Sequence, residues 1–262
     1  MDRRNKVSLW AYFDNRYETL ADAVLDFHMF GRSLNNELIF KGNWVYSRTD
    51  EEAKNNSGFN PIEEPGAYLE YLRSEYDRNI EEVGHYGDFG AVFSLSLPHA
   101  SSSPPNDPYN YYDIFDFDGG IDRHLSDQLL FRSERARGPA FFNLAEWTRL
   151  TELIVAWRVP RYIWFDSYLY ELEGRIHKHR AWGGWLGWFP QQIDATDLPL
   201  GALTIPVGPG TLVASQQNQL QSEIPAQLDK AQKVEQALVE LGLLPTKEDL
   251  IRASPRLPTS RD

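Results

Sequence analysis

The chain has 262 residues, of which 42% are hydrophobic and 24% charged, a composition typical of a globular protein rather than a disordered one. It has no cysteine, which excludes disulfides, thiolate zinc sites and cysteine nucleophiles, and it has neither a signal-peptide-like start nor an apolar run of about 18 residues, so we expect a cytoplasmic protein. Its formal net charge of −12 disfavours both nucleic acid and an anionic membrane as partners, because each requires a basic protein surface.

The first half of the chain is predicted to mix strands with helices. Residues 7–13 alternate between apolar and polar side chains, with aromatic and β-branched members, which predicts a strand. Apolar residues recur at helical spacing over residues 17–32 and again over 63–79, which predicts two amphipathic helices. Residues 91–97 and 109–117 are predicted strands, separated by a loop rich in serine and proline.

The second half contains the two clearest helix signals. Asn143 has the N-cap position of a helix, with Glu146 three residues later as in a capping box, and Pro160 ends this helix. Apolar residues recur every three or four positions over residues 224–241, and Gly242 follows as a C-terminal cap. Short apolar or alternating runs predict further strands, the last two forming a hairpin, at residues 129–133, 162–165, 184–189, 203–207 and 211–214.

These elements predict the fold class. Strands and helices interleave without a regular βαβ rhythm or an internal repeat. We therefore predict an α+β fold in which a mostly antiparallel sheet packs with amphipathic helices. Residues 1–252 are predicted to form a single domain, which could comprise two subdomains, and residues 253–262 a disordered tail.

The acidic charge is concentrated in one segment. Residues 50–122 contain 16 acidic and three basic side chains, whereas the rest of the chain contains 22 acidic and 23 basic ones. A surface that only keeps a protein soluble would usually spread its charge. The concentration therefore favours a positively charged partner, with a plain solvated face as the alternative.

Four aspartates within this segment raise the question of a metal site. Asp113, Asp116, Asp118 and Asp122 lie close together in the sequence and could belong to a calcium site or to a metal- or carboxylate-dependent hydrolase. An EF-hand loop in register with them would have apolar residues at its first and twelfth positions, where carboxylates are required. The chain also lacks a P-loop, a nucleophile elbow and a zinc-binding His-Glu-x-x-His helix.

Two further motifs have alternative interpretations. His177 and His179 would lie on the same face if they occupied a strand, as a metal-binding pair requires, but two such histidines are more often ordinary surface residues. The aromatic run over residues 182–189 contains three tryptophans interspersed with glycines. It is predicted to be a core strand, with an exposed aromatic anchor for a partner as the alternative.

Several short motifs recur in the order known from one family. They are Ala11-Tyr12-Phe13 followed by Arg16 and Glu18, then Trp44, Gly184 to Phe189, Leu198-Pro199, Gly210 to Val213, and Leu241 to Leu244. In this order they resemble the immunity protein 52 family of bacterial polymorphic toxin systems. The resemblance covers most of the chain and is weakest over residues 58–143. It implies a dedicated inhibitor of a nuclease toxin with a restriction-endonuclease-like fold, delivered in some systems by type VI secretion.

The charge pattern and the resemblance together predict an immunity protein rather than an enzyme, with no catalytic residue, cofactor or metal. Its expected partner is the cognate nuclease toxin, whose basic cleft would attract an acidic surface. The expected contact residues are acids and tyrosines of the acidic segment, namely Glu63, Glu64, Glu81, Glu82, Tyr109, Tyr111, Tyr112, Asp113, Asp116 and Asp118. The alternatives are the hydrolase above and a chaperone or adaptor that holds a secretion effector without neutralising it.

Overall fold

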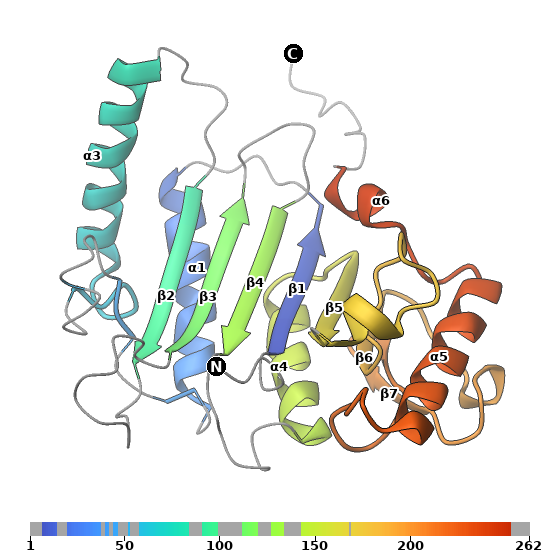
Figure 1. Cartoon of the computed structure of the whole chain (residues 1–262). Coiled ribbons are helices and arrows are strands. Elements are labelled where there is room, and N and C mark those ends of the chain that lie inside the picture. Colours follow the sequence, from blue (N-terminus) through green and yellow to red (C-terminus); the bar gives the residue numbers. More distant parts are fainter. Residues whose placement is uncertain are drawn as a thin grey trace.

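One antiparallel sheet runs through the molecule (Figure 1). The computed structural model describes residues 7–14, 20–37, 40–41, 44–46, 52, 58–83, 91–98, 112–119, 127–133, 143–167 and 169–252. Within these residues the sheet has eight strands in the order β2-β3-β4-β1-β5-β6-β8-β7, and every neighbouring pair is antiparallel. With helices packed on this sheet, the predicted α+β fold is confirmed.

The first strand of the chain lies in the middle of the sheet, where β1 pairs with β4 on one side and with β5 on the other. The strands, in chain order, are β1 Val7–Phe13, β2 Ala91–Pro98, β3 Tyr112–Gly119, β4 Asp127–Ser133, β5 Tyr162–Ser167, β6 Leu186–Phe189, β7 Leu203–Val207 and β8 Gly210–Ala214. All of the strands predicted from the sequence are present, and most differ from the prediction by a few residues at their ends.

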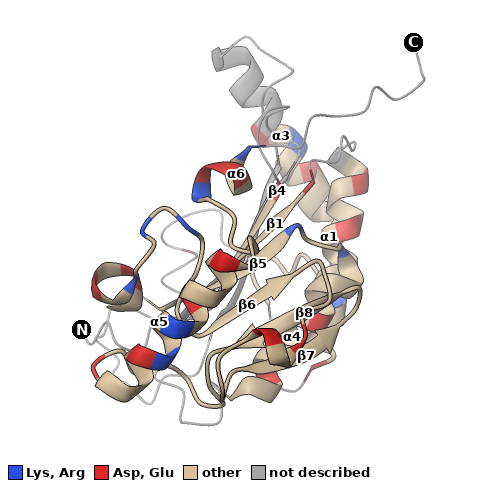
Figure 2. Cartoon of the chain, turned by 90° about the vertical axis from the view of Figure 1, so that its right-hand side faces the viewer, with Lys and Arg blue, Asp and Glu red and all other residues tan. Residues whose placement is uncertain are grey.

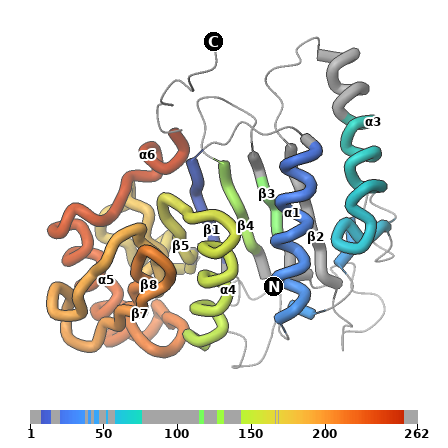
Figure 3. The backbone as a smooth tube through the Cα atoms, turned by 180° about the vertical axis from the view of Figure 1, so that it is seen from behind, coloured from blue at the N-terminus to red at the C-terminus, as the bar shows by residue number. Residues whose placement is uncertain are grey.

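The helices divide between the two faces of the sheet. They are α1 Leu20–Asn35, α3 Pro65–Val83, α4 Leu144–Trp157, the π-helix η3 Tyr170–Gly174, the 3-10 helix η4 Ala195–Asp197, α5 Pro225–Glu240 and α6 Lys247–Ile251. Seen from behind, α1 and α4 lie across one face of the strands, and α3 lies at the β2 edge (Figure 3). The C-terminal helices α5 and α6 lie at the other end of the sheet (Figure 1).

The predicted helix signals have the expected roles. The Asn143 side chain accepts a hydrogen bond from the Glu146 backbone N–H at 2.9 Å and so caps α4. Gly242 follows α5 with φ of +71°, the left-handed conformation that a C-terminal glycine cap provides. The tail predicted over residues 253–262 lies outside the described residues.

The aromatic run over residues 182–189, which includes β6, belongs to the core. Residues 181–189 are all buried, and the indole N–H groups of Trp185 and Trp188 donate to the carbonyls of Gln216 and Val207 at 3.0 and 3.1 Å. The Trp182 ring packs against the backbone of Gly187, where a Cβ atom would lie only 2.8 Å from the ring. The core interpretation is therefore confirmed, and the exposed-anchor interpretation is wrong.

A buried cation joins the helical layer to the sheet. Arg158, the C-cap of α4, has a side chain that is only 3% exposed. It contacts Asp26 of α1 at 2.5 Å and Asp127 of β4 at 3.4 Å, and its guanidinium lies 5.0 Å from the centre of the Phe117 ring and 4.9 Å from that of Trp157. Two carboxylates and two aromatic faces thus replace the water that the cation loses on burial.

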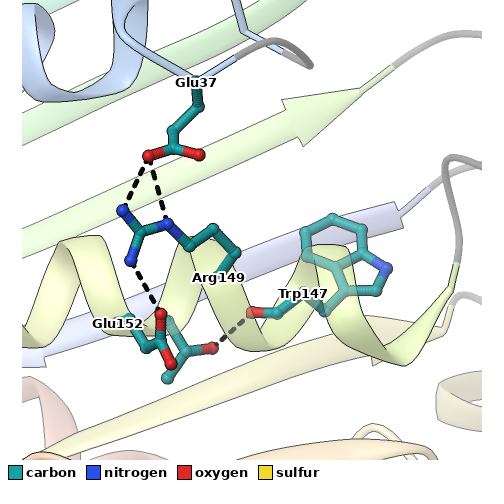
Figure 4. Close-up of polar contacts among 5 residues, drawn as sticks. Glu37, Trp147, Arg149 and Glu152 are labelled. Atoms are coloured by element: carbon teal, nitrogen blue, oxygen red, sulfur yellow. Dashed lines mark hydrogen bonds and ion pairs between the residues drawn. The ribbon is translucent and has the colours of Figure 1, made fainter.

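A second arginine links the same two helices at the surface. Arg149 of α4 donates to Glu37, just after α1, through Nη2 at 2.8 Å, and to Glu152 through Nη1 at 2.9 Å (Figure 4). These two carboxylates raise the pKa of Arg149. Its side chain is 50% exposed, so solvent screening leaves this link far weaker than the one at Arg158.

Replacing Arg158 with methionine should destabilise the protein by about 3–5 kcal/mol, because Asp26 and Asp127 would lose their buried counter-charge. The measurement is the free energy of unfolding in urea. Arg149→Met is the matched control, and it should cost no more than about 1 kcal/mol. Equal losses in the two variants would show that Arg158 does not hold the layers together.

Replacing Gly210 with alanine should cost about 3 kcal/mol or more, because the new Cβ would lie 2.0 Å from the Phe189 carbonyl oxygen and 2.5 Å from the Trp188 ring. Gly66 offers the control, since a Cβ there meets nothing within 4 Å, and Gly66→Ala should change stability by less than about 1 kcal/mol. Thermal unfolding of both variants measures the difference, and a native-like melting temperature for Gly210→Ala would contradict it.

Candidate functional site

One face of strands β3, β4 and β1 is free of described helices. On the other face, Phe115 and Phe131 are fully buried and contact Phe30 of α1 and Trp147 of α4. No helix that the structure describes lies over the opposite side of these three strands (Figures 1 and 3). We call this side the open face and define it by its half-buried residues Trp10, Asp116, Gln128 and Leu130.

The strand register aligns an acid with large apolar side chains across the open face. Asp116 pairs with Leu130, and Leu130 pairs with Trp10. Trp10 in turn pairs with Trp164 of β5. A row of part-exposed apolar residues with a carboxylate at its end has the composition of a protein-binding surface, where an apolar centre is bordered by polar groups.

The residues predicted to contact a partner fall on separate elements. Asp116 lies on the open face, and Tyr112, Asp113 and Asp118 belong to the same strand, β3. Glu63 and Glu64 are exposed just before α3, and Glu81 and Glu82 belong to its last turn. Tyr109, Tyr111 and also Asp122 lie outside the described residues.

The four predicted contact glutamates lie near the two ends of α3. Glu64 immediately precedes the helix and Glu81 lies in its final turn, so at 1.5 Å per residue they are about 26 Å apart along the axis. The acidic segment of the sequence is therefore spread over a helix and a strand rather than gathered at one point. Asp116 is a predicted contact residue that lies beside half-buried apolar side chains.

Of the aspartates considered as a metal or hydrolase site, Asp113 and Asp118 lie near opposite ends of β3. This strand is extended, so Asp113 and Asp118 are about 17 Å apart along it, too far to share one ion. In the part of the chain that the structure describes, no three His, Asp or Glu side chains come together in a way that could hold a metal.

The histidine pair lies in a turn and not in a strand, so the two side chains do not share a strand face. His177 and His179 follow η3, and the ring Nε2 of His177 is 2.9 Å from the Gln236 Oε1 atom on α5. The chain turns here because its backbone is held by Glu235, whose carboxylate accepts hydrogen bonds from the N–H groups of Ile176 and His177 at 3.2 and 2.7 Å.

Glu235 is the centre of a buried polar network that sequence reasoning missed. Its side chain is fully buried and also accepts a hydrogen bond from the Tyr170 hydroxyl at 2.5 Å. Burial and this bond raise the pKa of Tyr170, and burial likewise raises the pKa of Tyr162. A signal was present, because Glu235 lies four residues after Ala231 and three before Leu238, on the apolar face of α5.

The C-terminal half has mixed charge. Figure 2 shows acidic and basic residues interspersed on α5 and α6. On α5, for example, Lys233 pairs with Asp229 at 2.7 Å. The acidic excess thus does not extend over this side of the molecule. None of the described helices combines the length and the apolar character needed to cross a bilayer.

The chain has a distant likeness to a solved structure. No family model and no curated protein sequence matches the chain. The fold is similar to that of a T6SS protein from Pseudomonas aeruginosa, with a TM-score of 0.45 and 10% sequence identity over 90% of this chain and 83% of that one. A likeness at this level assigns neither family nor function, so membership of the immunity protein 52 family stays a prediction.

Stability should fall with rising pH above about pH 10. The folded protein keeps the protons of Tyr162 and Tyr170, whose pKa values are raised, whereas the unfolded chain releases them near pH 10. Below pH 10, therefore, neither tyrosine changes the unfolding free energy with pH. Above pH 10, each tyrosine lowers the unfolding free energy by up to about 1.4 kcal/mol per pH unit. Tyr162→Phe should flatten the plot of unfolding free energy against pH between pH 10 and 11, and an unchanged slope would contradict this.

Proposed function

We propose that this protein is an immunity protein that binds a cognate nuclease toxin in the cytoplasm and neutralises it. The observation that carries the proposal is the open face, where Asp116 borders the half-buried apolar row of Leu130 and Trp10. The concentration of acids over residues 50–122 supports a basic partner. The resemblance to the immunity protein 52 family supports a toxin as the partner, and a type VI secretion effector in particular.

The proposed mechanism is competition for a basic surface. A nuclease must present cationic groups to the phosphate backbone of its substrate. An acidic inhibitor is drawn to the same groups from a distance and can reach association rates well above those of a neutral pair. Desolvation of the apolar row at the centre of the contact would then slow dissociation. This mechanism uses no catalytic residue and no cofactor of the inhibitor.

The direct test is co-expression of the chain with the product of the adjacent gene, because an immunity gene lies beside its toxin gene. The expected result is that the neighbour alone stops growth and that the pair grows and yields a stable complex. A stable complex without rescue of growth would favour a chaperone or adaptor instead. Growth arrest that persists without any complex would overturn the proposal.

Association with that toxin should slow as salt increases, because screening weakens the long-range attraction between exposed charges. Asp116→Asn should lower the association rate roughly two- to fivefold at low salt. Asp197→Asn is the matched control, since Asp197 is exposed on η4, away from the open face. A salt-independent rate, or equal effects of the two substitutions, would overturn the electrostatic mechanism.

A further inference from the structure

Arg175, the residue after η3, holds a guanidinium group inside the protein. Its side chain is 2% exposed, and its Nη1 atom lies 3.5 Å from the Glu171 carboxylate. Among the described residues, its other two nitrogens, Nε and Nη2, have no hydrogen-bond partner. Such donors are rarely left unpaired in a folded protein, because the loss of water around a charged group is costly.

The unpaired nitrogens form the edge of the guanidinium that is suited to a carboxylate. One N–H bond of Nη2 runs parallel to the N–H bond of Nε, and this planar pair matches the two oxygens of a carboxylate. Glu235 lies near Arg175 in the folded chain but is already engaged, because its oxygens accept hydrogen bonds from Tyr170, Ile176 and His177. Glu171 reaches only the far nitrogen, Nη1.

The ammonium group of Lys247 lies over the same aromatic ring as the Arg175 guanidinium. The guanidinium of Arg175 lies 5.1 Å from the centre of the Trp164 ring, and the ammonium group of Lys247 lies 4.8 Å from it. Lys247 also contacts the Glu171 carboxylate at 2.5 Å, so two cations share one counter-ion. The indole N–H of Trp164 is a further buried donor without a partner in the described part of the chain.

We propose that Arg175, Lys247 and Trp164 form a binding site for a carboxylate ligand. The ligand would take the Nε and Nη2 edge of Arg175 and replace Glu171 as the partner of Lys247. Glu171 and Lys247 are 29% and 38% exposed, so these two side chains form the solvent side of the site. Trp164 neighbours Trp10 in the sheet, which places this site at the end of the apolar row on the open face.

The planar two-donor edge selects a carboxylate over a tetrahedral anion. The carboxylate could be that of a small organic acid or the C-terminus of a peptide. Acetate represents the former and N-acetylglycine the latter, and N-acetylglycinamide is the matched neutral control. The proposal stands apart from the toxin-binding one, because its test requires only the purified chain.

The experiment follows the indole N–H signal of Trp164 by NMR during titration of the full-length chain, at ionic strength held constant with sodium chloride. The signal is assigned by its loss in Trp164→Phe. Acetate and N-acetylglycine should each shift it in a saturable way, whereas the amide should not. Tighter binding of N-acetylglycine than of acetate would identify a peptide C-terminus as the ligand, and equal binding would identify the carboxylate group alone.

Three substitutions separate a binding site from a structural cluster. Glu171→Gln should lower the Kd for acetate roughly three- to tenfold, because the competing carboxylate is gone, and Lys247→Met should raise it by a similar factor. Lys233→Met, at an exposed lysine of α5 that pairs with Asp229, should leave the Kd within about twofold.

Three results would overturn the proposal. The first is a shift that does not saturate or that the neutral amide reproduces. The second is an unchanged Kd in Glu171→Gln, a variant that keeps Arg175 and its packing. The third is tighter binding of inorganic phosphate than of either carboxylate.

Discussion

The buried Arg158 guanidinium is the interaction on which the arrangement of the layers depends. It is held by Asp26 of α1 and Asp127 of β4 and stacked on aromatic rings from β3 and α4. A charge in this position is tolerable only while both helices stay against the sheet, because movement of either would leave it without water and without a partner. The cluster therefore fixes α1 and α4 on one face and gives the sheet two unlike sides.

The difference between the two sides of the sheet determines where a partner or ligand can bind. The helix-covered side is filled by stacked aromatic rings, such as Phe115 on Phe131 at 4.4 Å, and offers no group to a partner. The other side changes along the sheet. Over β3, β4 and β1 it is the open face. Towards β5, Arg175, which follows η3, and Lys247 of α6 lie on Trp164 and cover this side. Leu130, Trp10 and Trp164, which pair across β4, β1 and β5, connect the open face to this covered region.

Local signals predicted the elements of the fold well, whereas the surroundings of the charged side chains depend on tertiary contacts. The cap at Asn143, the glycine at 242 and the alternation in β1 each act over a few residues, so the sequence alone identifies the elements they bound. The division of the acids between a helix and a strand follows from the predicted elements, but the distance between these elements depends on tertiary topology, which single-chain periodicity does not contain. The Arg175 guanidinium lies over Trp164 of β5, a long-range contact that no spacing in the sequence indicates.

The central position of β1 has a consequence for how the chain folds. Its partner β4 ends at Ser133 and its other partner β5 ends at Ser167, so about 160 residues must be synthesised before the first strand has both neighbours. At ribosomal rates this takes roughly 8–30 s, during which an apolar strand has at least one open edge. Pairing over such long sequence separations also slows folding itself. The early N-terminal segment is thus the part of the nascent chain most dependent on protection from aggregation.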